Sequence, residues 1–193
     1  AIDESLFSVS VRDDGSGTNK FFLEQFNKNI NMDFADDFNG TAGVFSVSSH
    51  FSNGAVVDVI DNTEYLGSFT VSGGNVDVSA VKASISAEIG FKFVPELQTM
   101  PIDAQVPGGP LTGRPRKITN VILDLQETLS VSVNGTNMII RNVNFNPATP
   151  REAFTGKKEF RVLGYSKDPT VTISQIAPLN MQLNGMVVEV AFQ

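Results

Sequence analysis

Alternation of apolar and polar residues with a period of two is the feature that most constrains the fold of this chain. The pattern begins at Phe7, Val9 and Val11, which alternate with polar residues. It returns at 57–59, 69–71, 76–78, 89–93, 121–125, 129–133, 171–173 and 188–192. Such alternation is typical of half-buried β-strands. No segment keeps a helical stripe over more than two turns, and residues 81–87 are the best short candidate for a helix.

Turn-forming residues separate these runs. Residues 13–17, Asp-Asp-Gly-Ser-Gly, predict a hairpin loop between two apolar segments. Further hairpin signals stand at 53–54, 73–74 and 134–135, where Asn-Gly or Gly-Gly suits the positive φ of tight turns. Two loops rich in proline are expected at 106–115 and 146–150.

The alternation and the turns together predict an all-β protein made of antiparallel sheets, arranged as a sandwich or a barrel-like layer. Residues 40–88 are short-stranded and rich in Gly, Ser and Val. We therefore expect a small inserted β subdomain over 40–88. Residues 1–39 and 89–193 would form the main β domain around it.

Composition removes several kinds of chemistry. Without cysteine there are no disulfides and no thiolate ligands, and the single histidine, His50, excludes sites that need several imidazoles. The net charge of -7 argues against broad nucleic-acid binding, because phosphates are anionic. The chain has 15 phenylalanines but only 2 tyrosines and no tryptophan, which favours cores and interfaces over sugar stacking. No apolar run reaches the roughly 18 residues of a transmembrane helix, so no membrane span is expected.

The densest acidic cluster contains Asp33, Asp36 and Asp37. Several carboxylates close together suit Ca²⁺, but this spacing does not match the helical calcium-binding loop. Two interpretations stay open here: a metal site, or the carboxylates of a solvated loop, which we favour. No cofactor is expected.

No catalytic constellation is visible in the sequence. The glutamates are scattered, and nothing in their spacing places two of them in one cleft. A nucleophilic serine would need His50 as its base, and the Gly-x-Ser-x-Gly sequence is absent. We interpret His50 as a strand-end or turn residue. We therefore predict that the protein is not an enzyme and name no catalytic, cofactor-binding or metal-binding residue.

Three segments of the C-terminal half resemble one protein family. The first, 114–134, is a basic start and a long strand that ends in Leu-Ser-Val-Ser-Val-Asn. The second, 154–165, begins Phe-Thr-Gly-Lys-Lys-Glu-Phe-Arg, and the third, 169–190, contains Val-Thr-Ile-Ser-Gln and Pro-Leu-Asn-Met-Gln-Leu. With looser matches at 21–33, 70–76 and 89–93, all in family order, the chain resembles the C-terminal region of podophage tail tubular protein B, the tail nozzle protein. The family often has Arg in place of Gln25 and Pro in place of Asn180.

The resemblance implies a structural component of the virion of a short-tailed phage, and no catalytic residues. Identical subunits, six in a ring, would surround the channel through which DNA leaves, beside adaptor and tail fibre proteins. DNA would pass without sequence-specific binding. The protein would lie in the phage tail, and in the host cytoplasm during assembly. Because the family protein is much longer, this chain would be its C-terminal region. The alternative is a receptor- or carbohydrate-binding β module of a phage tail.

Overall fold

The computed structural model describes residues 6–14, 16–27, 29–102, 105–106, 109–110, 116–138, 151–161 and 166–192. Within these ranges the chain forms antiparallel β-strands and no helix, which confirms the all-β prediction. It follows that no helix in this part of the chain is long and apolar enough to cross a membrane. The chain divides into two compact units, residues 1–93 and 94–193.

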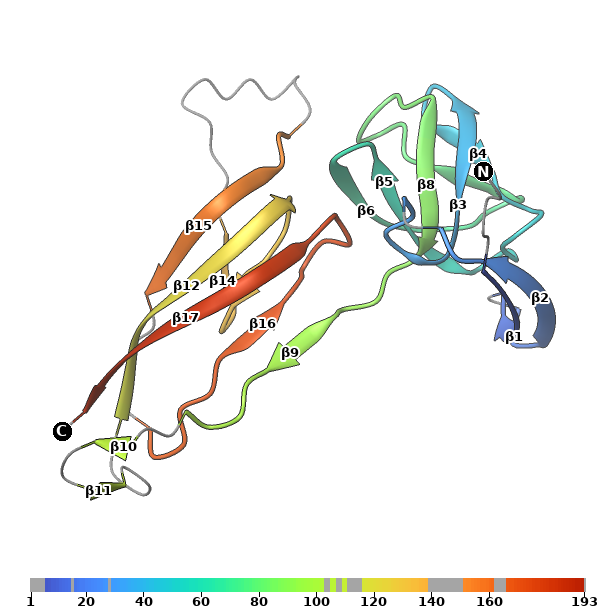
Figure 1. Cartoon of the computed structure of the whole chain (residues 1–193). Helices are drawn as coiled ribbons and strands as arrows, with labels where there is room; N and C mark the ends of the chain where they lie inside the picture. The colour runs from blue at the N-terminus through green and yellow to red at the C-terminus, as the bar shows by residue number, and fades with distance from the viewer. Residues whose placement is uncertain are drawn as a thin grey trace, which may run out of the picture. The chain divides into compact units, whose positions relative to one another are not determined.

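The first unit contains a two-stranded hairpin and a six-stranded sheet (Figure 1). The hairpin joins β1 (Phe7–Asp13) to β2 (Asn19–Gln25) through the loop predicted from the Asp-Gly sequence. The other strands are β3 (Asp33–Thr41), β4 (Val44–Ser46), β5 (Val56–Asp61), β6 (Glu64–Thr70), β7 (Asn75–Asp77) and β8 (Ser86–Phe91). They follow the order β6-β5-β8-β3-β4-β7 and curl into a half-barrel.

The concave side of this sheet holds the core of the first unit. Phe45, Val57 and Ile89 are completely buried there, each on a different strand. Phe51 is 2% exposed, follows β4 and precedes β5 in the sequence, and belongs to the same cluster. The remaining buried members are Phe38, Val47, Ala55, Val59, Val71, Val76, Val78 and Ala87. One continuous apolar cluster therefore holds all six strands together.

A β-bulge in β3 brings its backbone very close to β8. The pairing of β3 with β8 shifts register between Asp33 and Asp36, and Phe34 takes a positive φ of 49°. A Cβ atom on Gly90 would lie 2.3 Å from the Cβ of Ala35. The absence of a side chain at Gly90 therefore allows the bulged backbone of β3 to approach β8. Bulges increase the local bend and twist of a sheet.

The second unit contains two larger sheets and a minimal hairpin. The minimal hairpin pairs β10 (Gln105–Val106) with β11 (Gly109–Pro110). The other strands are β9 (Glu96–Gln98), β12 (Arg116–Thr128), β13 (Ser132–Val133), β14 (Thr136–Asn137), β15 (Phe154–Arg161), β16 (Thr172–Ser174) and β17 (Gln182–Phe192). One sheet has the order β15-β12-β17, and the other the order β14-β13-β16-β9.

The two larger sheets share one core and so form a sandwich. Val121, Leu123 and Leu125 alternate along β12 and are completely buried. Val133 and Ile173, from the other sheet, belong to the same cluster. Arg116 at the start of β12 is also buried, and its guanidinium donates to the backbone carbonyls of Ile102 and Lys167. This arginine therefore ties the segments at Ile102 and Lys167 to the start of β12.

The strands group differently from the expected division at 40–88. β3 begins at Asp33 and β8 ends at Phe91, and these two strands lie in the middle of the six-stranded sheet that contains all the strands of 40–88. The chain divides instead after residue 93. Residues 81–87, the helix candidate, contain no helix: residues 81–85 are turn and irregular backbone, and Ser86 and Ala87 are the first residues of β8. The cause is that strand periodicity identifies strands but carries no information on which strands pair.

Two of the predicted hairpin turns are confirmed, whereas Asn53 and Gly54 form a turn between β4 and β5, which do not pair with each other. Asn134 and Gly135 have φ values of 47° and 77°, as a tight hairpin turn requires, and join β13 to β14. Gly73 and Gly74 likewise have positive φ inside a short turn. The expected loop at 146–150, and most of the one at 106–115, lie outside the described residues.

Gly90→Ala tests the close approach at the bulge. The added methyl group meets the backbone and side chain of Ala35, so we expect a loss of about 1–3 kcal/mol in the free energy of unfolding. Gly185→Ala is the matched control, because a Cβ there has no atom within 4 Å, and its effect should stay within about 0.5 kcal/mol. Chemical denaturation followed by circular dichroism measures both. Equal effects of the two substitutions would contradict the bulge geometry.

Candidate functional site

The polar residues of the first unit gather where the β1–β2 hairpin meets the curled sheet. Strand alternation places Ser10 and Arg12 on the face of β1 that turns toward β3, and Phe22 and Glu24 on the same face of β2. These side chains are half-buried, whereas their neighbours along each strand are exposed. The inward face of the hairpin is therefore largely polar.

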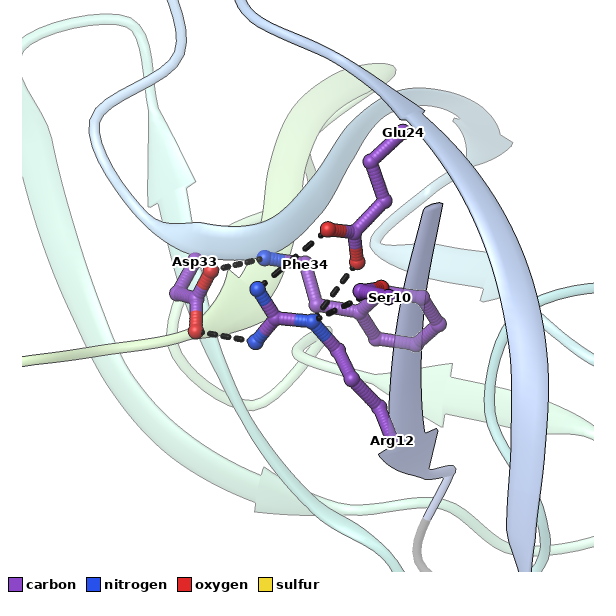
Figure 2. A network of polar contacts seen from close by, with 5 residues as sticks. All are labelled: Ser10, Arg12, Glu24, Asp33 and Phe34. Atoms are coloured by element: carbon purple, nitrogen blue, oxygen red, sulfur yellow. Dashed lines mark hydrogen bonds and ion pairs between the residues drawn. The ribbon is translucent and has the colours of Figure 1, made fainter. Parts of the chain in front are cut away.

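Arg12 connects the hairpin to the sheet (Figure 2). Its Nε lies 2.7 Å from Glu24 Oε1 on β2, and its Nη1 lies 2.5 Å from Asp33 Oδ2 at the start of β3. Ser10 Oγ accepts a further hydrogen bond from Nε at 3.3 Å. The hydrogen bond with Asp33 is the main cause that raises the pKa of the Arg12 guanidinium. One cation thus bridges two carboxylates from different parts of the unit.

Phenylalanine rings continue this connection into the core. Phe22 of the hairpin meets Phe34 edge-on, with ring centroids 4.6 Å apart. Phe34 in turn lies 5.5 Å from Phe51, and Phe51 lies 5.3 Å from Phe91. Phe34 has a positive φ, and its ring contacts both Phe22 of the hairpin and Phe51 of the core. The bulge in β3 is therefore the point at which the hairpin and the core share a side chain.

A second polar clasp lies at the hairpin loop. Asp14 is 5% exposed, and its Oδ2 contacts Lys20 Nζ at 2.5 Å and accepts a hydrogen bond from Ser52 Oγ at 2.8 Å. The backbone N–H of Ser52 also donates to the carbonyl of Asp14 at 3.0 Å. Lys20, followed by Ser16 and Ser52, holds the pKa of the Asp14 carboxyl well below its usual range. Asp14 does more than the turn role that its position before glycine suggested.

Glu88 secures the segment that leads from the hairpin into β3. It is 7% exposed, and Oε1 accepts hydrogen bonds from the backbone N–H of Asn31 at 2.7 Å and of Met32 at 2.9 Å. Burial raises the pKa of this carboxyl, and the hydrogen bonds from Asn31 and Met32 oppose that shift. No sequence pattern identified Glu88, although it lies between Ala87 and Ile89 beside the predicted strand 89–93, and a glutamate between apolar neighbours is a signal of a buried carboxylate.

An open, polar hollow of about 330 Å³ lies beside the second clasp. Its lining includes Asp14, Lys20, Phe22, Ser48, Ser49, His50, Ser52 and Asn53. Ser49 Oγ lies 2.8 Å from His50 Nδ1, and His50 Nε2 lies 3.3 Å from Asp36 Oδ2. The order serine, histidine, aspartate is that of a hydrolytic triad.

The surroundings of this trio do not favour acyl transfer. Side-chain exposure is 36% for His50 and 58% for Asp36, so water competes for the contact that would orient the imidazole. A nucleophile elbow uses the N–H of the next residue to hold the oxyanion. Here the N–H of His50 already donates to the carbonyl of Val47 at 3.0 Å. The trio closes a turn, which agrees with our interpretation of His50.

The acidic cluster belongs to β3 and not to a solvated loop, so that expectation was wrong. Asp33 binds Arg12, whereas Asp36 faces His50. Among the residues that the structure describes, no group of three or more His, Asp or Glu side chains could hold a metal ion. Exposed carboxylates gave this segment the composition of a loop, although Phe38 anchors it in the core.

Arg12→Gln tests the first clasp. Removal of the cation leaves Glu24 and Asp33 close together without a counter-charge, so the hairpin should open more often. Because these side chains are partly exposed, we expect a loss of about 1 kcal/mol in hairpin stability, smaller at high salt. Hydrogen exchange of the β1 and β2 amides measures it. Lys82→Gln, which breaks the similarly exposed pairs with Asp61 and Glu64, should leave those amides unchanged.

The second clasp predicts acid sensitivity of the hairpin loop. Because the folded-state pKa of Asp14 lies below that of the unfolded chain, its contribution to stability is present above about pH 4 and is lost as pH falls through the folded-state value. Asp14→Asn should reduce the loss of stability at acid pH, which is measured as the fall in melting temperature with decreasing pH. Lys20→Gln should flatten it in the same direction, since Lys20 is the largest cause of the shift. An unchanged acid limb in both variants would contradict the clasp.

The outward face of the hairpin has the opposite character to the clasps. It carries exposed apolar side chains from both strands, among them Val9, Phe21 and Leu23. Polar side chains therefore attach the hairpin to its own unit, and apolar ones face away from it.

Comparison with models of protein families finds no match, and comparison with curated proteins finds no significant match either.

Proposed function

We propose that this chain is a structural component of the tail of a short-tailed phage, the C-terminal region of the tube or nozzle through which DNA is ejected. The collinear resemblance from Arg114 to Val190 supports the family assignment. The observation that carries the structural role is the apolar outward face of the β1–β2 hairpin. Surfaces of this kind mark contacts with other protein surfaces.

The two clasps support the same proposal. Arg12 and Asp14 fix the hairpin with charged contacts and hydrogen bonds, so its outward face is presented in one orientation. A rigid, preorganised surface loses less conformational freedom when it associates than a mobile loop does. Assembly into a conduit needs such surfaces, and it needs no reacting group.

Charge is consistent with a conduit for DNA. The net charge of -7 repels phosphates, so DNA that passes such a wall would not adhere to it. Arg116, a basic residue at the start of β12, is buried. DNA, adaptor and tail fibre proteins and a ring of six identical subunits belong to this proposal as partners.

Electron microscopy of the full-length product of the gene that encodes this chain tests the proposal. We expect rings with a central channel in the purified protein, and immunogold label on the tails of virions that carry the gene. Duplex DNA should show no sequence-specific binding in fluorescence anisotropy. A product that forms no rings, is absent from virions and binds defined glycans on an array would overturn the proposal in favour of a carbohydrate-binding module.

A further inference from the structure

The three-stranded sheet of the second unit has two long edges. β12 lies in its middle, and β15 and β17 flank it. Among the residues that the structure describes, no strand pairs with the outer edge of β15 or of β17. Backbone N–H and C=O groups along an unpaired edge are a template for a further strand. Each edge can therefore accept a strand from another chain.

The two edges differ in charge. Four of the eight residues of β15 are charged, and three of these are basic. β17 has eleven residues but one charge, the carboxylate of Glu189. Charged side chains on an edge strand disfavour pairing with unselected partners, so β15 selects a partner that complements its cations, whereas β17 is almost unprotected.

Strand register places opposite charges at the two ends of one row of the sheet. Asn120 of β12 is paired with Arg161 on one side and with Glu189 on the other. Glu189 Oε2 accepts a hydrogen bond from Asn120 Nδ2 at 2.6 Å. Arg161 and Glu189 are exposed, and neither forms an ion pair within the described part of the chain. The row thus ends in a cation at the β15 edge and an anion at the β17 edge.

The neighbouring row is apolar from one edge to the other. Val121 is paired with Phe160 on β15 and with Val188 on β17. Val121 and Phe160 are buried, whereas Val188 is half-buried because the sheet ends beside it. A strand added at the β17 edge would cover the rest of Val188 if it carried an apolar side chain in this row. β15 carries such a side chain, Phe160.

We propose that β17 of one copy of this chain pairs with β15 of a second copy, head to tail. β15 and β17 both run antiparallel to β12, so they run in the same direction. A second copy in the same orientation therefore presents its β15 parallel to β17, and parallel strands form evenly spaced backbone hydrogen bonds. With the rows aligned, Glu189 lies beside Arg161 of the second copy, and Val188 lies beside its Phe160.

Charge favours this contact over a contact between like edges. Two β15 edges would bring the basic side chains of both copies together, and two β17 edges would leave Arg161 without a carboxylate. In the head-to-tail contact the other aligned rows bring no like charges together. They place Gly185, Met186 and Val187 beside Lys157, Lys158 and Glu159 of the second copy.

This inference rests on the proposed function, because it names a contact between neighbouring subunits of the ring. Each copy has one β15 edge and one β17 edge, so the contact repeats from copy to copy and closes into a ring where the rotation allows it. Rings that ignore the charges of Arg161 and Glu189 would overturn the edge pairing and leave the proposed function intact. Edge pairing in a protein that is absent from virions would do the reverse.

Sedimentation velocity of the 193-residue chain over the micromolar range tests the pairing. We expect oligomers that grow with concentration, and we expect Arg161→Glu and Glu189→Arg each to weaken association at least about tenfold, because like charges then meet. Lys157→Glu is the matched control. It changes the net charge as Arg161→Glu does, on the same strand, but its row ends at Gly185, which has no side chain. Its association should be unchanged.

A mixture of the two weakened variants separates the contact from a folding defect. Arg161→Glu copies have a carboxylate at both ends of the row, and Glu189→Arg copies have a cation at both ends. Each variant alone should stay monomeric where the original chain associates. Their equimolar mixture should associate again, because every contact between unlike copies pairs opposite charges.

Hydrogen exchange shows whether the backbone takes part. Protection of the amides of β15 and β17 should rise with protein concentration, whereas protection of β6, an edge of the sheet in the first unit, should not. A monomer throughout the micromolar range, equal weakening by Lys157→Glu and Arg161→Glu, no recovery in the mixture, or no added protection of β15 and β17 would each overturn the edge pairing.

Discussion

Arg12 holds the β1–β2 hairpin to the rest of its unit by bridging two carboxylates, Glu24 on the hairpin and Asp33 on β3. A two-stranded hairpin is marginally stable by itself, so it needs such a contact to keep one orientation. The bridge decides which face of the hairpin is inward. Phe22 can then reach Phe34, and the apolar side chains of the other face are directed away from the unit.

The strands of the hairpin could be predicted from the sequence, but their orientation could not. Alternation of Phe7, Val9 and Val11 with polar residues predicts a strand with two unlike faces. The usual assumption turns the apolar face inward, whereas here Ser10 and Arg12 are on the inward face. Orientation depends on the distant carboxylate of Asp33, and no local pattern contains that information.

The residues of the candidate site could likewise be recognised in the sequence only in part, because their partners are distant in the chain. The acidic residues of β3 were visible as a cluster, but composition favoured a loop because three aspartates lie within five positions. Register with β8 separates them in the fold, so Asp33 reaches Arg12 and Asp36 reaches His50. Glu88 was missed because its partners are backbone N–H groups about 57 residues away. Turns such as Asn134-Gly135 were predictable, because their conformation depends on neighbouring residues alone.

Strand pairing also sets the order in which the chain can fold during synthesis. The strands of the first unit lie close in sequence, so the half-barrel can close as soon as residue 91 has emerged from the ribosome. In the second unit, Leu97 of β9 pairs with Ile173 of β16, and β12 is completed by β17 at the C-terminal end. Leu97 therefore has no strand partner until Ile173 has been synthesised. The first unit can fold before the sheets of the second unit are complete.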